Sequence, residues 1–202
     1  MRQESRISWT RQRAAYLGED GYVTASLYSD NVRGGWITPQ QYLEFVQPYE
    51  MAIAELHGGV NYWHSCGDTT TFLKEVNALP LELFHVGPWT DVEKAAETFG
   101  AHGVALEICL QKHGEYGPGP WPASDDIFRA TSEDVESKIQ QTARGALRGG
   151  ATAFSIEAGP LHRRRGAEED VKTIKRWVRT ARAALAGLVP WADIGIRQIL
   201  RC

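Results

Sequence analysis

The sequence lacks the segments that mark secreted and membrane-anchored proteins. It has no run of eighteen apolar residues, and the N-terminal stretch MRQESRISWTRQR contains no apolar signal segment. Cysteine is also scarce. The three cysteines show no disulfide-framework spacing, which is typical of proteins in a reducing compartment. We therefore expect a cytoplasmic protein without a membrane partner.

Excess positive charge is the second absence. The 202 residues carry a net charge of −3 with a pI of about 6.1, so no long-range field attracts nucleic acid. Hydrophobic residues make up 43% of the chain and charged residues 23%, as in ordinary globular domains. We therefore expect no nucleic-acid partner. The local basic run at residues 162–165 is typical of a solvated loop, and binding of a carboxylated substrate stays open as the alternative.

Glycine-rich nucleotide fingerprints are the third absence, because neither GxGxxG nor GxxxxGK[ST] follows any predicted strand. Short apolar segments bounded by glycine or proline predict five strands, at residues 22–28, 60–64, 81–85, 104–109 and 152–157. The predicted helices lie at residues 6–17, 39–57 (kinked at Pro48), 68–77, 90–100, 132–147 and 168–186. This alternation predicts an α/β fold built from parallel β/α units.

The stretch YWHSCGDTTT at residues 62–71 places a histidine two residues before a cysteine, at the end of a predicted strand. Side chains two residues apart in a strand point to the same face, so His64 and Cys66 should lie together. Imidazole and thiolate are donors that zinc prefers. The pair therefore predicts half of a zinc site, and a buried histidine beside an inert cysteine stays open as the alternative.

An acidic, imidazole or thiol side chain also lies at or just after the end of each of the other predicted strands. Asp30 follows the first strand, and His85, Cys109 and Glu157 end the third, fourth and fifth. A (β/α)8 barrel keeps its chemistry at this end of its strands. Five strands do not close such a barrel, which typically needs about 250 residues. A turn role for Asp30, a structural hydrogen bond for His85 and simple burial for Cys109 stay open as alternatives.

Ordered segments between about residues 20 and 186 carry a resemblance to a known family. They are the strand end at Asp30, ITPQQYLEFVQPYEMAI, WHSCGDTTTFLKEV, TDVEKAAETFG, SEDVESKIQQTARGALRGGATAFSIEAG and a final long helix. With them the chain resembles the C-terminal two-thirds of the uroporphyrinogen decarboxylase superfamily, which includes the methylcobamide:coenzyme M methyltransferases. The HxCG element is the most specific feature and is similar to the methyltransferase branch, in which the histidine and cysteine bind zinc.

The resemblance implies a TIM (β/α)8 barrel whose first two or three strands are absent from this chain. An incomplete barrel exposes unpaired strand edges, which favour association with another chain. We therefore expect a fragment of a longer protein, and we expect this chain alone to self-associate.

The resemblance also implies a third zinc ligand near the end of the last barrel strand. The family has a second cysteine there, whereas this chain reads SIEAGP. Glu157 lies in that strand, and a carboxylate is an acceptable zinc donor, so the predicted ligands are His64, Cys66 and Glu157. Cys109 ranks second as the third ligand, and His113 ranks last.

Three functions follow from the resemblance. In methyl transfer, zinc would convert a small-molecule thiol into a thiolate that attacks a methyl-corrinoid carried on a partner protein. In metal-independent decarboxylation, as in porphyrin biosynthesis, arginines would hold the carboxylates of a tetrapyrrole while an acid protonates the carbanion. The third is a non-catalytic remnant. The predicted catalytic residues are Asp30 and His85, and the predicted substrate-binding residues are Arg33, Trp36, Trp121 and Arg163.

Overall fold

Five parallel strands form one sheet in the order β1-β2-β3-β4-β5, in a computed structural model that describes residues 2–18, 25–110, 127–158 and 166–188. The strands are β1 (Ala25–Tyr28), β2 (Val60–His64), β3 (Leu83–Val86), β4 (Ala105–Cys109) and β5 (Phe154–Glu157). Each strand pairs in parallel with the next one along the chain. The predicted α/β class and its parallel β/α units are confirmed.

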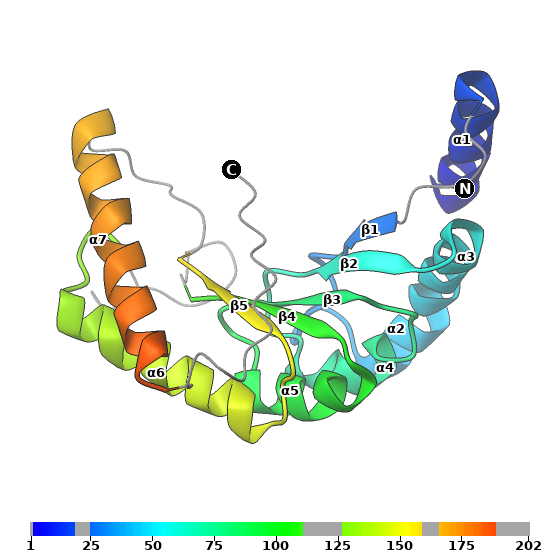
Figure 1. Ribbon diagram of the computed structural model, residues 1–202. Coiled ribbons are helices and arrows are strands. Elements are labelled where there is room, and N and C mark those ends of the chain that lie inside the picture. Colours follow the sequence, from blue (N-terminus) through cyan, green and yellow to red (C-terminus); the bar gives the residue numbers. More distant parts are fainter. Residues whose placement is uncertain (1, 19–24, 111–126, 159–165, 189–202) are drawn as a thin grey trace.

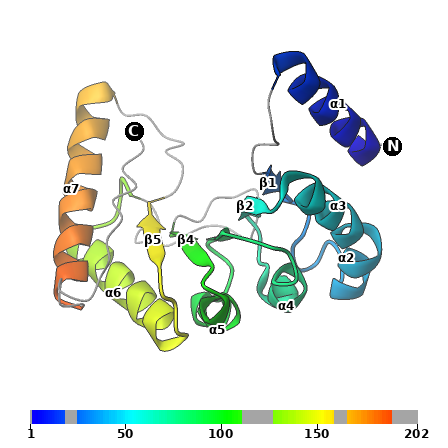
Figure 2. The ribbon, with the colours of Figure 1, turned by 45° about the vertical axis from the view of Figure 1, so that its right-hand side comes forward.

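Helices connect the strands and follow one face of the sheet (Figures 1 and 2). They are α1 (Arg2–Leu17), α2 (Pro39–Phe45), α3 (Gln47–His57), η1 (Thr70–Phe72), α4 (Leu73–Val76), α5 (Val92–Phe99), η2 (Gly100–His102), α6 (Ser132–Arg148) and α7 (Ala167–Ala186). Helices α2 to α6 run along the outer side of the curved sheet, and its other face carries no described helix. Within the described ranges, β1 and β5 each have a single neighbouring strand, so the sheet is not closed. The architecture is that of a partial TIM barrel.

The core lies between this sheet and the helices. Trp63 and Phe84 are cross-strand partners whose rings stack at 5.3 Å between centroids, and Phe84 stacks on Phe99 of α5 at 4.3 Å. All three side chains are fully buried. Aromatic stacking of this kind adds to the free energy that burial itself supplies, so it fixes the middle strands against α5.

The predicted helix at residues 39–57 is two helices rather than one kinked helix. Helix α2 ends at Phe45, and Val46 departs from helical geometry, with φ −120° and ψ −55°, before α3 begins at Gln47. Pro48 lies in the first turn of α3, where a missing N–H breaks no intrahelical hydrogen bond. A new helix, α3, therefore begins next to the proline, and no continuous helix is kinked there.

The predicted helix at residues 68–77 is shorter in the structure, where it consists of η1 and α4. Asp68 Oδ1 accepts a hydrogen bond from the backbone N–H of Thr70, which makes a turn where a helix was expected to begin. The other predicted elements agree to within a few residues, and residues 22–24 of the first predicted strand lie outside the described ranges. No helix in the described part of the chain is both long and apolar enough to cross a membrane.

A buried carboxylate joins the first two strands to the helices between them. Glu50 of α3 is 2% exposed and accepts hydrogen bonds from Tyr42 Oη at 2.7 Å and from Trp63 Nε1 at 3.2 Å. Ser29, directly after β1, donates to the same carboxylate at 2.5 Å. Each donor comes from a different element, so this one side chain holds β1, β2 and α2 against α3.

We expect Glu50→Ala to lower the free energy of unfolding by about 2–5 kcal/mol, because it leaves the fully buried Tyr42 and Trp63 donors without an acceptor. Urea unfolding followed by Trp fluorescence measures the change. Glu55→Ala, which removes an exposed carboxylate from the same helix, is the matched control and should change stability by less than about 0.5 kcal/mol. Equal losses in the two variants would contradict the role given to Glu50.

The two outer edges of the sheet predict self-association of the chain. β1 and β5 each present one side without a partner strand in the described structure, and such edges pair with other chains. Size-exclusion chromatography with light scattering should therefore show oligomers or aggregates. A stable monomer with cooperative unfolding would contradict this prediction.

Candidate metal centre

One face of the sheet carries polar side chains close to the carboxyl ends of the strands. Cross-strand partners point to the same face, and the register pairs Tyr28 with His64 and Cys109 with Glu157. Trp63 lies one residue before His64 and faces the helices, so His64 faces the side without described helices. The parallel register therefore collects these side chains on the face that would line the interior of a barrel.

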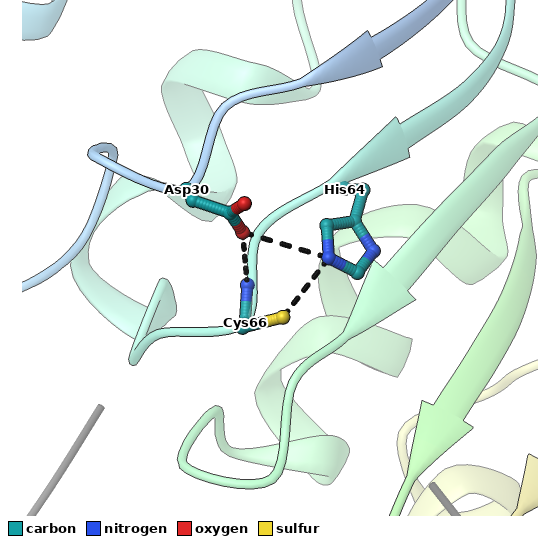
Figure 3. Close-up of side chains that lie close together, drawn as sticks. All are labelled: Asp30, His64 and Cys66. Carbon is teal, nitrogen blue, oxygen red and sulfur yellow. Dashed lines mark hydrogen bonds and ion pairs between the residues drawn. The ribbon is translucent and has the colours of Figure 1, made fainter. Parts of the chain in front are cut away.

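Asp30, His64 and Cys66 form the first group of metal-binding side chains (Figure 3). His64 is the last residue of β2, and its Nε2 lies 3.0 Å from Cys66 Sγ and 3.5 Å from Asp30 Oδ1. The same Asp30 oxygen accepts the backbone N–H of Cys66 at 3.0 Å, which fixes the turn after the strand. One donor atom from each of the three residues lies within 4.8 Å of the others.

A chain of hydrogen bonds sets the tautomer of His64. Tyr62 Oη lies 3.0 Å from His64 Nδ1 and donates its single proton to Glu107 Oε2 at 2.5 Å. Because that proton is committed to the carboxylate, Nδ1 carries the proton of the His64–Tyr62 bond. The lone pair of His64 is therefore on Nε2, the nitrogen that faces Cys66 and Asp30.

Burial keeps His64 and Cys66 uncharged at neutral pH. It lowers the pKa of His64 to about 4, with His85 adding to the effect, and raises the pKa of the Cys66 thiol to about 12, with Asp30 adding to that effect. Since Nε2 of His64 holds a lone pair, the 3.0 Å contact requires the Cys66 thiol as its donor. A cation that replaces this proton would find an imidazole nitrogen, a thiolate and a carboxylate.

The first group fits zinc by both chemistry and spacing. Nitrogen, sulfur and oxygen donors are the usual zinc ligands. Donors about 2.0–2.1 Å from a tetrahedral ion lie about 3.3 Å apart, which is close to the 3.5 Å between His64 Nε2 and Asp30 Oδ1. A nitrogen and a sulfur donor lie about 3.6 Å apart, so the Cys66 sulfur would move outward by roughly half an ångström from 3.0 Å.

The second group consists of His85, Cys109 and Glu157, whose donor atoms also lie within 4.8 Å of one another. His85 Nε2 is 3.7 Å from Glu157 Oε1, and its ring stacks on the ring of His64 at 4.1 Å between centroids. The neighbouring His85, opposed by burial, lowers the pKa of Glu157, so this carboxyl is ionised at neutral pH. The two groups are therefore neighbours on the same face of the sheet.

The structure distributes the predicted ligands over both groups. His64 and Cys66 lie together as predicted from their spacing, and Asp30, predicted as a catalytic acid, lies beside them. Glu157, predicted as the third ligand of that pair, lies with His85 and Cys109 instead. Its role as a ligand stays a prediction, as does the ranking of Cys109.

The predicted substrate-binding residues are only partly described. The guanidinium of Arg33 lies over the ring of Trp36, 3.7 Å from its centroid, in the loop that follows β1. Arg33 is buried, whereas Trp36 is 63% exposed. Trp121, Arg163 and the third-ranked ligand His113 lie outside the described residues.

Sequence reasoning missed Tyr62 and Glu107, the two residues that orient His64. A signal was present, because Tyr62 precedes His64 by two residues and Glu107 precedes Cys109 by two, so each shares a face with a predicted ligand. The hydrogen bond between Tyr62 and Glu107 could not be predicted from the sequence, because it joins β2 and β4, which are not neighbouring strands.

The loops that follow β2 and β3 are joined by short-range contacts. Thr90 Oγ1 accepts the N–H of Thr69 at 3.0 Å and donates to the carbonyl of Gly67 at 3.2 Å. A Cβ on Gly87 would lie 2.9 Å from the carbonyl oxygens of Ser65 and Gly67, so only glycine allows this approach. The turn that carries Cys66 is thereby held against the neighbouring loop.

A family model described as uroporphyrinogen decarboxylase (URO-D) matches residues 18–111. The matched segment runs from β1 to β4 and contains the whole first group and the His85 and Cys109 of the second. No curated protein and no solved structure matches the chain. This match supports the superfamily predicted from the ordered segments, whereas the methyltransferase branch stays a prediction.

The depressed pKa of His64 predicts that the metal-free protein loses stability in mild acid. The pKa is about 4 in the folded chain and about 6.5 in an unfolded chain, so between these values the unfolded state binds more protons. Stability should therefore fall by up to about 3 kcal/mol from this residue as pH drops from 6.5 to 4. Urea unfolding in the presence of a chelator, compared between wild type and His64→Gln, isolates this contribution. Equal pH slopes in the two proteins would contradict it.

Proposed function

Because residues 18–111 match the uroporphyrinogen decarboxylase family model, we propose that the chain binds zinc through Asp30, His64 and Cys66 and transfers a methyl group from a methyl-corrinoid to a thiol. The observation that supports the proposal is the convergence of a nitrogen, a sulfur and an oxygen donor within 4.8 Å at the end of β2. Three protein donors leave a fourth tetrahedral position for a substrate, as in catalytic zinc sites.

The protein's own residues prepare this site before any ligand binds. Tyr62 Oη accepts the Nδ1 proton of His64 and donates its own proton to Glu107, which directs the Nε2 lone pair of His64 toward the site. Asp30 holds the Cys66 turn through the backbone N–H. Cys66 gives up its thiol proton when a metal binds, because only the thiolate is a strong ligand.

A zinc ion bound there would lower the pKa of a substrate thiol and make it a nucleophile at neutral pH. In the overall reaction the thiol loses its proton to solvent, a sulfur–carbon bond forms, and the cobalt–carbon bond breaks with both electrons left on cobalt. The corrinoid, carried on a partner protein, supplies the difficult bond cleavage, so this chain has only to bind and orient the thiol.

We propose that Arg33 and Trp36 help to bind the substrate thiol. A Cβ on Gly67, next to Cys66, would lie 2.4 Å from a carbon of the Arg33 side chain, so Arg33 packs directly against this turn. The stacked indole of Trp36 is exposed beside it. A positive charge and an aromatic surface at this place favour a thiol that carries an anionic group.

The test uses the full chain with free methylcobalamin as methyl donor and a small anionic thiol as acceptor, followed by the absorbance change on loss of the cobalt–carbon bond. We expect zinc-dependent turnover in wild type and its loss in Cys66→Ser. Turnover that is unaffected by removing zinc would contradict the proposal. No zinc binding, together with decarboxylation of a uroporphyrinogen, would favour the metal-independent alternative.

Measuring zinc affinity in two tyrosine variants distinguishes a metal-binding His64 from a purely structural one. Tyr62→Phe removes the oxygen that accepts the Nδ1 proton of His64 and should weaken zinc binding by about 10- to 100-fold in competition with a chromophoric chelator. Tyr28→Phe is the matched control, because this exposed ring lies 5.2 Å from the ring of His64 and its hydroxyl is not part of the hydrogen-bond chain. Equal affinity in the two variants would show that Tyr62 does not orient a ligand.

A further inference from the structure

The second group of donors, His85, Cys109 and Glu157, is built from the ends of three adjacent strands. Cys109 and Glu157 are the last residues of β4 and β5 and are cross-strand partners, and His85 lies in β3. His85 is 2% exposed and Cys109 is 5% exposed. Two buried donors and the 43% exposed side chain of Glu157 thus converge at a place that the proposed methyl-transfer chemistry does not use.

The backbone fixes the orientation of the His85 ring. Nδ1 lies 3.0 Å from the carbonyl oxygen of Ser65, and because a carbonyl only accepts, Nδ1 carries a proton. In the neutral ring the lone pair is therefore on Nε2, which faces Glu157 Oε1. Metal-binding histidines are typically held in this way, with the second ring nitrogen bonded to a carbonyl or carboxylate.

The spacing between His85 and Glu157 is that of two ligands rather than of a hydrogen bond. Nε2 and Oε1 are 3.7 Å apart, which exceeds the range of 2.7–3.2 Å for an N–H···O bond. Nitrogen and oxygen ligands of a tetrahedral zinc ion lie about 3.3 Å apart. An imidazolium paired with the carboxylate would account for these two residues, and the thiol of Cys109, which interacts with Glu157, adds a third metal-binding donor within 4.8 Å of both.

We propose that His85, Cys109 and Glu157 form a second site for a zinc-like divalent cation, adjacent to the site formed by Asp30, His64 and Cys66. The two groups share no donor, so each binds its own ion and the second site stands without the methyl-transfer proposal. Zinc is the expected class of ion because nitrogen, sulfur and oxygen donors are combined. Cys109 binds as the thiolate and releases its proton to solvent.

Metal titration of the full chain tests the number of sites. Protein purified without a metal-chelating tag and stripped with a chelator is titrated with Zn²⁺, and in parallel with Co²⁺, whose thiolate charge-transfer band counts bound sulfur. We expect two ions per chain in wild type, one in Asp30→Asn and one in Glu157→Gln. Cys109→Ser should halve the charge-transfer absorbance, and Cys202→Ser, the control for an unrelated thiol, should leave it unchanged.

Two results would overturn the second site. One ion in wild type that persists in Glu157→Gln would show that the second group is only an imidazolium–carboxylate pair. One ion that is lost in both Asp30→Asn and Glu157→Gln would show a single site composed of both groups. Should Glu157→Gln fail to fold, as judged by circular dichroism, the wild-type stoichiometry and Cys109→Ser decide the question.

Discussion

Parallel pairing in a nearly constant register is the constraint on which the rest of the structure depends. It aligns the carboxyl ends of five consecutive strands, so that residues far apart in the chain, such as Tyr28 and His64 or Cys109 and Glu157, become neighbours. The alternation of side chains then sends the large apolar residues to the helices and the polar ones to the opposite face. A shift of one residue in any strand would exchange the two faces and place the donors in the core.

Electrostatics at this face follow from burial rather than from net charge. The imidazole of His64 and the thiol of Cys66 are uncharged at neutral pH because desolvation disfavours their ionised forms. The metal-free chain therefore folds without placing an unpaired thiolate or imidazolium in a buried position. A bound cation would change this balance, because its charge would compensate the thiolate formed when Cys66 loses its proton.

The sequence predicted correctly those features that depend on residues close together in the chain. The two-residue spacing predicted that His64 and Cys66 lie together, because strand geometry alone decides it, and the alternation of strands and helices predicted parallel β/α units. The sequence did not predict features that depend on contacts between residues far apart in the chain. Asp30 lies beside the pair because its carboxylate accepts the N–H of Cys66, and Glu157 lies beside His85 because β3, β4 and β5 are adjacent. The break at Val46 between two helices was not predicted, because the sequence alone does not distinguish a proline in the first turn of a new helix from one that kinks a continuous helix.

The hydrogen bonds of Thr90 to Thr69 and Gly67 have a consequence for ligand binding. Immobilising side chains or a loop around a ligand costs about 0.5–1.5 kcal/mol of entropy for each flexible side chain. Here the turn that carries Cys66 is already ordered by the neighbouring loop when the chain folds. A ligand that binds at this turn would therefore pay little additional entropy for ordering the loop.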